Sequence, residues 1–284
     1  MCLVAFAINA SARWPLVIAA NRDEFLDRST LALARWQTGS GQEVISGRDL
    51  RAGGTWLGMT PDGRVAFLTN VREASPPAAP RSRGELVTRW LEAAGDATSF
   101  VAALESDRGA YGGFNLVLGD FEHNTWTWVT NKPATSSGWH AQSLPPGVYG
   151  LSNAQLDAPW PKTMELKRVL AAALLDGQSD SRPDMLQTQL WTALANPERA
   201  PAGQLPDTGV APALEEALSS AFVDFPEYAY GTRSSTLLLA SAQGTQNGAR
   251  RWAIQVEEKT HCRIDAGIKE ESRVERCLLS WPQA

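Results

Sequence analysis

The sequence CLVAFAI at residues 2–8 forms an apolar run at the start of the chain, and a second apolar run, LVIAA, follows at residues 16–20. Between them lies a turn-rich segment at residues 9–15. Two short apolar runs joined by such a segment are typical of a β-hairpin. The first strand would begin with Cys2 and would be buried. The rest of the fold has to be built around this hairpin.

Further along the chain, strands and helices alternate in blocks. Glycines at 46–49 and 52–55 indicate a loop, and Ser82 and Glu85 have the spacing of a helix capping box. Strands are predicted at 65–68, 114–118, 126–130, 148–151, 235–240, 252–256 and 274–279, and helices at 86–94, 99–105, 164–175, 185–194 and 213–221. This order favours an α+β protein with mostly antiparallel sheets inside. We expect one domain over residues 1–284.

Composition narrows the function classes. The 284 residues are 43% hydrophobic and 20% charged, within the range of ordinary globular proteins, and the formal charge of -5 argues against a nucleic-acid partner. No run approaches the roughly 18 apolar residues of a membrane span, and the first apolar run lacks the basic flank of a signal peptide. We therefore expect a cytoplasmic protein without a membrane span.

Metal and nucleotide chemistry are not indicated. The three cysteines have no metal-type spacing, the histidines are also only three, and no glycine loop of the phosphate-binding type precedes a helix. The sequence therefore predicts no cofactor and no metal. The expected partner is a small-molecule ligand or substrate.

Cys2 has two interpretations. Removal of Met1 would leave a residue with both a thiol and a free α-amine, whose ordinary pKa values are about 8.5 and about 7.7–8.0. The amine could then serve as the base for the thiol without any histidine. Alternatively, Cys2 is a small apolar residue that opens a strand.

Polar side chains stand at the ends of several predicted strands. Asp23 follows the second strand, Asn70 and Asn153 follow two others, and Arg233 precedes a fourth. Each alone is common in turns. Together they supply a carboxylate, two amides and a cation, which could orient an amine and stabilise an oxyanion.

Several motifs resemble the NRDE family, also called the transport and Golgi organisation protein 2 family. They span nearly the whole chain: the opening Met-Cys, ANRDEF at 20–25, SGRD at 46–49, GGTWLG at 53–58, TNVR at 69–72, GLSN at 150–153, LD at 156–157, PWPK at 159–162 and YGTRSST at 230–236.

That family is remotely similar to cysteine hydrolases with an N-terminal nucleophile, which are four-layer αββα sandwiches that cleave linear amides. The resemblance implies that Cys2 is the nucleophile and that Asp23 orients the α-amine. It implies that Asn153, with Asn70, binds the oxyanion. Those hydrolases carry an arginine three residues before the aspartate, where this chain has Ala20.

The resemblance also implies the remaining roles. Arg233 would tune the thiolate and help to hold the substrate. Arg22 and Trp56 would contact the substrate. Arg22 is the candidate to replace the arginine that is missing at position 20, but its side chain is expected on the other face of the strand.

Two functions follow from these residues. The first is hydrolysis of linear carbon–nitrogen bonds through an acyl-thioester on Cys2. The second is a carrier or trafficking role, in which the same fold holds a hydrophobic acidic ligand such as haem or acyl-CoA without catalysis. The ligand in either case is expected to be apolar with an acidic or amide group.

Overall fold

Alternate residues of β1 (Leu3–Ile8) enter two different cores. Val4, Phe6 and Ile8 pack into one apolar cluster, while Leu3 and the other odd-numbered residues pack into another. A strand that is buried on both faces must lie in the middle of a layered structure. The computed structural model, which describes residues 3–133, 138–176, 183–246, 249–264 and 268–282, shows these layers.

Two seven-stranded sheets face each other, and all neighbouring strands within them are antiparallel. The first sheet has the order β10 (Gly147–Leu151), β1, β2 (Leu16–Phe25), β12 (Tyr230–Gln246), β13 (Ala249–Ile264) and β14 (Ile268–Trp281), and β11 (Asp224–Phe225) pairs with β12. The second has the order β3 (Thr30–Gln37), β4 (Glu43–Asp49), β5 (Leu57–Met59), β6 (Arg64–Asn70), β7 (Phe114–Asp120), β8 (Thr125–Thr130) and β9 (His140–Ser143).

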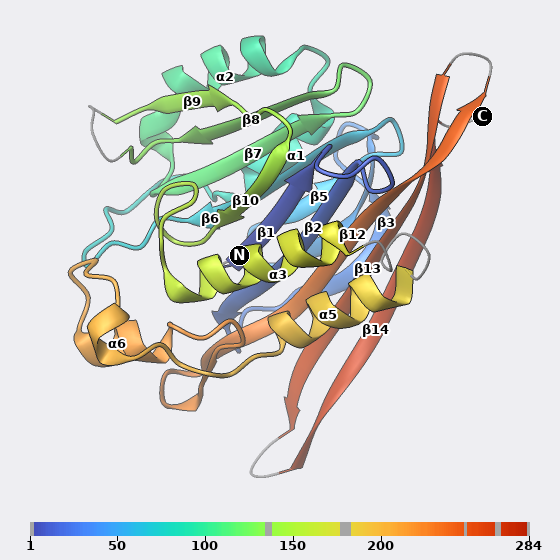
Figure 1. Cartoon of the computed structure of the whole chain (residues 1–284). Coiled ribbons are helices and arrows are strands. Elements are labelled where there is room, and N and C mark those ends of the chain that lie inside the picture. The colour runs from blue at the N-terminus through green and yellow to red at the C-terminus, as the bar shows by residue number, and fades with distance from the viewer. Residues whose placement is uncertain (1–2, 134–137, 177–182, 247–248, 265–267, 283–284) are drawn as a thin grey trace.

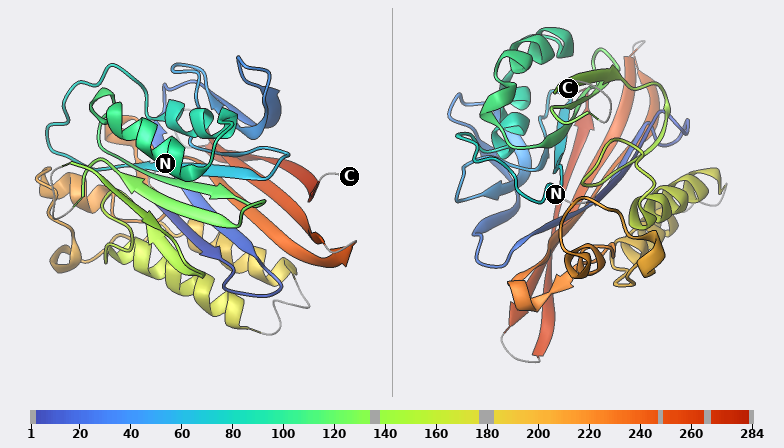
Figure 2. Two further views of the ribbon diagram at one scale, coloured as in Figure 1. Left: turned by 90° about the horizontal axis from the view of Figure 1, so that it is seen from above. Right: turned by 90° about the vertical axis from the view of Figure 1, so that its left-hand side faces the viewer.

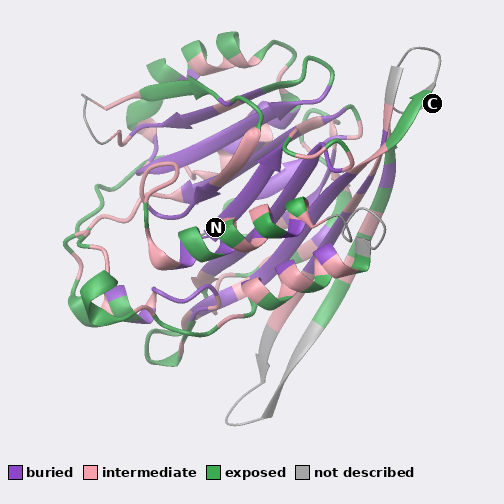
Figure 3. Cartoon of the chain, viewed as in Figure 1, coloured by how far each residue is buried: buried purple, intermediate pink, exposed green. Residues whose placement is uncertain are grey.

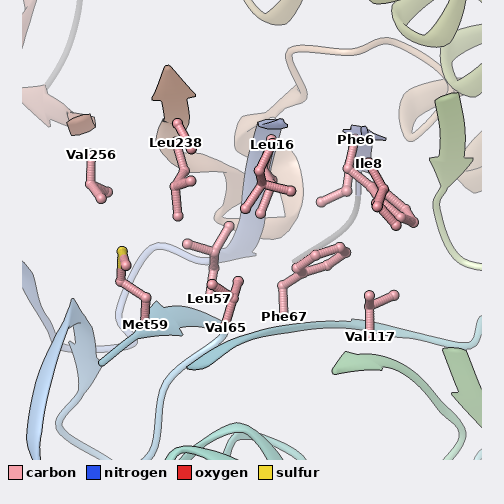
Figure 4. Close-up of a cluster of buried hydrophobic side chains, with 14 of the residues drawn as sticks. Phe6, Ile8, Leu16, Leu57, Met59, Val65, Phe67, Val117, Leu238 and Val256 are labelled. Carbon is pink, nitrogen blue, oxygen red and sulfur yellow. The ribbon is translucent and has the colours of Figure 1, made fainter. Parts of the chain in front are cut away.

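The largest core lies between the sheets. In Figure 4, Phe6, Leu16 and Leu238 of the first sheet point toward Leu57 and Phe67 of the second. The rings of Phe6 and Phe67 meet edge to face with centroids 5.0 Å apart. Complete burial of one such side chain contributes about 1.5–3 kcal/mol to folding, so this interface holds the two sheets in a fixed relation.

Helices cover the outer face of each sheet (Figures 1 and 2). The second sheet packs against α1 (Gly84–Glu92) and α2 (Ala97–Ser106), and the first against α3 (Pro161–Leu175) and α5 (Pro183–Leu194). The remaining helices of the described residues are α6 (Pro212–Ala217) and three 3₁₀ turns at Arg108–Ala110, Ala202–Gln204 and Pro226–Tyr228. Figure 3 shows buried strands inside and exposed helix faces outside. The predicted α+β, αββα sandwich is confirmed.

Three local predictions were wrong. The segment SGRD at 46–49 lies in strand β4 rather than in a loop, because β3 and β4 form a hairpin whose charged residues hide the strand pattern. The second strand does not end at residue 20, since β2 continues through the polar residues to Phe25. The capping box is also absent, because α1 begins after Arg83, which makes no side-chain cap.

Candidate functional site

The continuation of β2 places its polar side chains on alternate faces. Asn21 faces the helical layer, where its amide nitrogen donates to the carbonyls of Leu194 and Ala221 at 2.8 Å each. Arg22, the next residue, lies over the ring of Trp56 on the side of the second sheet. Ala20 also faces the core between the sheets, so the expectation that Arg22 lies on the other face of the strand from position 20 is wrong, because residues two apart in a strand share a face.

Arg22 is a buried cation with incomplete pairing. Its side chain is 4% exposed, and its guanidinium carbon lies 4.4 Å from the centroid of the Trp56 ring. Nη2 approaches carboxylate oxygens of Glu24 at 3.6 Å and Asp49 at 3.9 Å, and Nη1 has no hydrogen-bond partner among the described residues. Burial lowers the pKa of Arg22, while the two carboxylates oppose that effect. A bound anion would complete its pairing.

The neighbouring carboxylate is already engaged. Asp49 accepts a hydrogen bond from Nε of Arg28 at 2.7 Å, and its other oxygen accepts from the backbone N–H groups of Arg51 and Ala52. These bonds hold Asp49 toward Arg28 and the loop after β4. They explain why Arg22 is left without a close acceptor.

Gly47 makes room for the Trp56 ring. A Cβ at this position would lie 2.5 Å from Cη2 and Cζ2 of Trp56, closer than any real contact. The hydroxyl of Thr55 donates to the carbonyl of Gly47 at 2.7 Å and fixes the chain just before the ring. Gly47 therefore serves the packing of the tryptophan.

A cavity of about 520 Å³ opens beside Arg22 and Trp56. Five arginines line it: Arg22, Arg28, Arg51, Arg81 and Arg83. The carboxylates in its lining are Glu24 and Asp49, so the wall has an excess of positive charge. Its volume suits a small molecule, and its charge favours an acidic one.

Asn70 and Asn153 are brought together at the border of this cavity. Asn70 lines the cavity, and Nδ2 of Asn153 donates to the backbone carbonyl oxygen of Asn70 at 2.9 Å. The carbonyl of Asn153 in turn accepts from the N–H of Arg72 at 2.8 Å. An amide nitrogen carries two hydrogens, and among the described residues only the Asn70 carbonyl accepts one of them, which leaves the other N–H of Asn153 for a further acceptor.

Asp23 and Arg233 do not line this cavity. Asp23 accepts a hydrogen bond from the hydroxyl of Thr232 at 2.7 Å. Arg233 donates from Nη1 to the carbonyls of Phe25 and Leu26 at 2.9 and 2.8 Å and so holds the turn after β2. Its charge nevertheless contributes to lowering the pKa of Arg22, so it belongs to the same end of the sheet.

Cys2 lies outside the described residues. The next residue, Leu3, pairs with Asn21, and Val4 pairs with Leu151. The strand ends that carry Arg22 and Asn153 therefore flank the described start of β1.

Glu258 is a buried acid that the sequence analysis missed. Its side chain accepts hydrogen bonds from the Leu33 N–H at 2.8 Å and from the Thr236 hydroxyl at 3.3 Å. Burial raises its pKa, against the effect of these bonds and of the Arg22 charge. The alternation Trp252, Ile254, Val256 along β13 leads to Glu258 and would have indicated its inward face.

Within the described ranges, no three or more His, Cys, Asp or Glu residues are grouped so that they could hold a metal ion. In the same part of the chain, no helix is long and apolar enough to cross a membrane.

The sequence matches the family Transport and Golgi organisation 2 over residues 1–251. The chain belongs to this family. It is 34% identical over 259 residues to the Transport and Golgi organization protein 2 homolog of Bos taurus, which covers 86% of this chain and 90% of the relative. The Drosophila melanogaster protein is 27% identical over 260 residues, covering 86% and 89%. The family resemblance seen in the motifs is confirmed.

Two solved structures are also similar. The Caenorhabditis elegans N-acylethanolamine-hydrolyzing acid amidase ortholog has 12% identity and a TM-score of 0.45, covering 68% of this chain and 86% of that one. The C2A mutant of conjugated bile acid hydrolase from Clostridium perfringens has 10% identity and a TM-score of 0.43, covering 96% of each chain.

Proposed function

We propose that this protein is an N-terminal cysteine hydrolase that cleaves linear amide bonds through an acyl-thioester on Cys2. The observation that carries the proposal is the Asn153–Asn70 contact beside an arginine-lined cavity, at the end of the first sheet where β1 begins. A hydrolase needs amide donors, a substrate cavity and a nucleophile close together. Cys2 precedes Leu3 at this end of the sheet.

The first half of the reaction transfers the acyl group to sulfur. After removal of Met1, the α-amine of Cys2 takes the thiol proton, and the thiolate attacks the amide carbonyl carbon. The carbonyl oxygen of the substrate becomes an oxyanion and accepts a hydrogen bond from the remaining N–H of Asn153. The carbon–nitrogen bond then breaks, and the ammonium returns its proton to the leaving nitrogen.

The second half restores the enzyme. A water molecule attacks the thioester carbon, and the α-amine removes a proton from this water. The carbon–sulfur bond breaks, sulfur leaves as the thiolate and is reprotonated by the ammonium, and a carboxylic acid is released. Atoms and charges balance without a metal or redox cofactor.

The supporting roles follow from the positions of the other residues. We assign to Asp23, which Thr232 fixes by a hydrogen bond, the orientation of the α-amine. Arg233 holds the turn after β2 and adds positive charge that favours a thiolate. Arg22 and Trp56 form the wall against which an acidic or amide-bearing substrate rests.

We further propose that residues 1–284 act as one cytoplasmic domain. The core between the sheets takes Val4 from one end of the chain and Leu279 from the other, so neither end can be separated from it. A reducing compartment would keep the nucleophilic thiol free.

A carrier role is the second candidate function. The incomplete pairing of the buried Arg22 side chain favours it. A buried guanidinium stacked on Trp56, with Nη1 unpartnered among the described residues, is suited to hold the acid group of an apolar ligand. Haem and acyl-CoA are ligands of this type. A carrier would need no free thiol at Cys2.

Trapping of the acyl-enzyme separates the two candidates. The protein is first checked by intact mass for loss of Met1, and it is then mixed with an N-acyl amino acid and quenched in acid. The hydrolase predicts a mass increase equal to the acyl group on the N-terminal peptide. A protein with a free Cys2 that binds the compound and never acquires this mass would be a carrier.

A further inference from the structure

We propose that a second cavity, on the other side of the Asn70–Asn153 contact, receives the acyl chain of the substrate, and that the substrate class is the N-acyl amino acids. This inference rests on the proposed hydrolase function and adds the identity of both halves of the substrate. It follows from two cavities of contrasting chemistry that share one wall.

The second cavity has a volume of about 570 Å³ and lies next to the first. Asn153 lines it, whereas Asn70 lines the first cavity, and the 2.9 Å hydrogen bond between these residues joins the two walls. The chain after β6 and the segment before α6, which run side by side (Figure 1), form part of the lining, and the segment between β10 and α3 forms the rest.

Apolar residues make up just over half of the lining of the second cavity. Seven of its thirteen residues carry apolar side chains, among them Val71, Trp160 and Leu205. A cavity of this composition gains free energy by removing hydrocarbon from water. An acyl chain is the part of an amide substrate that fits it.

The positive charge of Arg72, which lines this cavity, is neutralised by an ion pair. Its side chain is 8% exposed and forms an ion pair with Glu215, which also accepts from the N–H of Thr208 at 3.0 Å. The guanidinium carbon lies 4.8 Å from the centroid of the Trp160 ring. The remaining charged lining residue, Asp207, is exposed. The second cavity therefore lacks the positive excess of the first.

The contrast between the two cavities fixes which end of the substrate amide lies in which cavity. The acyl carbon chain lies in the second cavity, and the carboxylate of the amino acid lies among the arginines of the first. The scissile carbonyl is then at the shared wall, within the part of the site where Asn153 has an N–H to donate. Hydrolysis in this orientation transfers the acyl group to Cys2 and releases the amino acid.

Binding constants of three matched compounds test this assignment without requiring turnover. N-decanoylglycine has both features, N-decanoylglycinamide lacks the charge, and N-acetylglycine lacks the chain. Calorimetry on the full chain is expected to give at least tenfold tighter binding of the first compound than of either other.

Two variants separate the cavities. Arg51→Ala should remove the preference for the carboxylate and keep that for the long chain, because Arg51 is exposed and lines only the first cavity. Leu205→Asp should do the reverse, and Leu205→Ala serves if the aspartate variant fails to fold. Arg273→Ala and Leu175→Asp, at positions 77% and 86% exposed and outside both cavities, should change neither preference.

Each outcome decides the assignment. Equal affinity for the charged and uncharged compounds, equal affinity for the long and short chains, or loss of both preferences in one variant would overturn it. A wild type that shows both preferences and hydrolyses nothing would overturn the hydrolase proposal while supporting the two-cavity assignment.

Discussion

The guanidinium carbon of Arg22 lies over the Trp56 ring, 4.4 Å from its centroid, and both side chains are almost fully buried. Arg22 comes from β2 of the first sheet, whereas Trp56 immediately precedes β5 of the second. The pair therefore joins the two sheets at the border of the candidate site, and the charge faces an arginine-rich cavity.

Replacement of Arg22 by Lys tests the stacked geometry rather than the charge. Lysine keeps the positive charge but loses the planar fork and its contact with the ring. Because desolvated cation–π contacts reach about 2 kcal/mol, we expect affinity for N-decanoylglycine to fall roughly tenfold or more. Arg168→Lys, on the exposed face of α3, is the control. An unchanged dissociation constant would remove Arg22 from the binding site.

Replacement of Gly47 by Ala tests the packing under the ring. The new Cβ would lie 2.5 Å from two Trp56 atoms, so the ring has to move. Overpacking of this kind costs about 1–3 kcal/mol, which urea denaturation can measure. Gly39→Ala is the control, because no atom lies within 4 Å of its Cβ position. Equal stability of the two variants would show that Trp56 is not held in this place.

Replacement of Asn153 by Ala tests the oxyanion donor. Loss of one such donor lowers kcat by about 10²–10³-fold in other enzymes, and KM should change little because the bond forms in the transition state. Asn153→Asp has nearly the same size but no N–H and should lose as much activity. If only KM rises, Asn153 binds substrate and does not stabilise the oxyanion.

Glu258 predicts a specific pH dependence of stability. Burial raises its pKa in the folded protein above the ordinary value of 4.5, so the unfolded state releases this proton at lower pH. The stability due to the protonated form is fully present below pH 4.5 and is lost as the pH rises through the folded pKa.

Glu258→Gln removes that titration. The free energy of unfolding of the variant, minus that of wild type, should increase as the pH rises from 4 to 8 in urea denaturation. Glu105→Gln, at an exposed position on α2, should show no such trend. A difference that is constant over this range would mean that Glu258 titrates normally.

The layered fold could be predicted largely from the sequence, because the hairpin at residues 2–20 and the helical segments follow simple periodicity. The hairpin of β3 and β4 escaped prediction, since only Leu33 in β3 is fully buried and Gly47 suggested a loop.

The cavity could not be predicted as a whole. Arg81 and Arg83 reach it from the segment before α1, which is held against the GGTW motif by the bond from Thr55 N–H to the Gly84 carbonyl. A Cβ on Gly54 would lie 2.5 Å from backbone atoms of Gly84, so this approach needs glycine. Such a contact between distant segments leaves no periodic signal in the sequence.

The most direct test of the hydrolase proposal is the rate of amide hydrolysis by wild type and by Cys2→Ala, with loss of Met1 confirmed by intact mass in both. Penicillin V, conjugated bile salts and N-acyl amino acids form the substrate panel, and affinity is measured in parallel. We predict that wild type releases the amine, and that Cys2→Ala has no measurable turnover while its dissociation constants stay within about twofold, since the substitution removes the nucleophile and little volume. Turnover by Cys2→Ala at the wild-type rate, or binding without any turnover by wild type, would contradict the proposal.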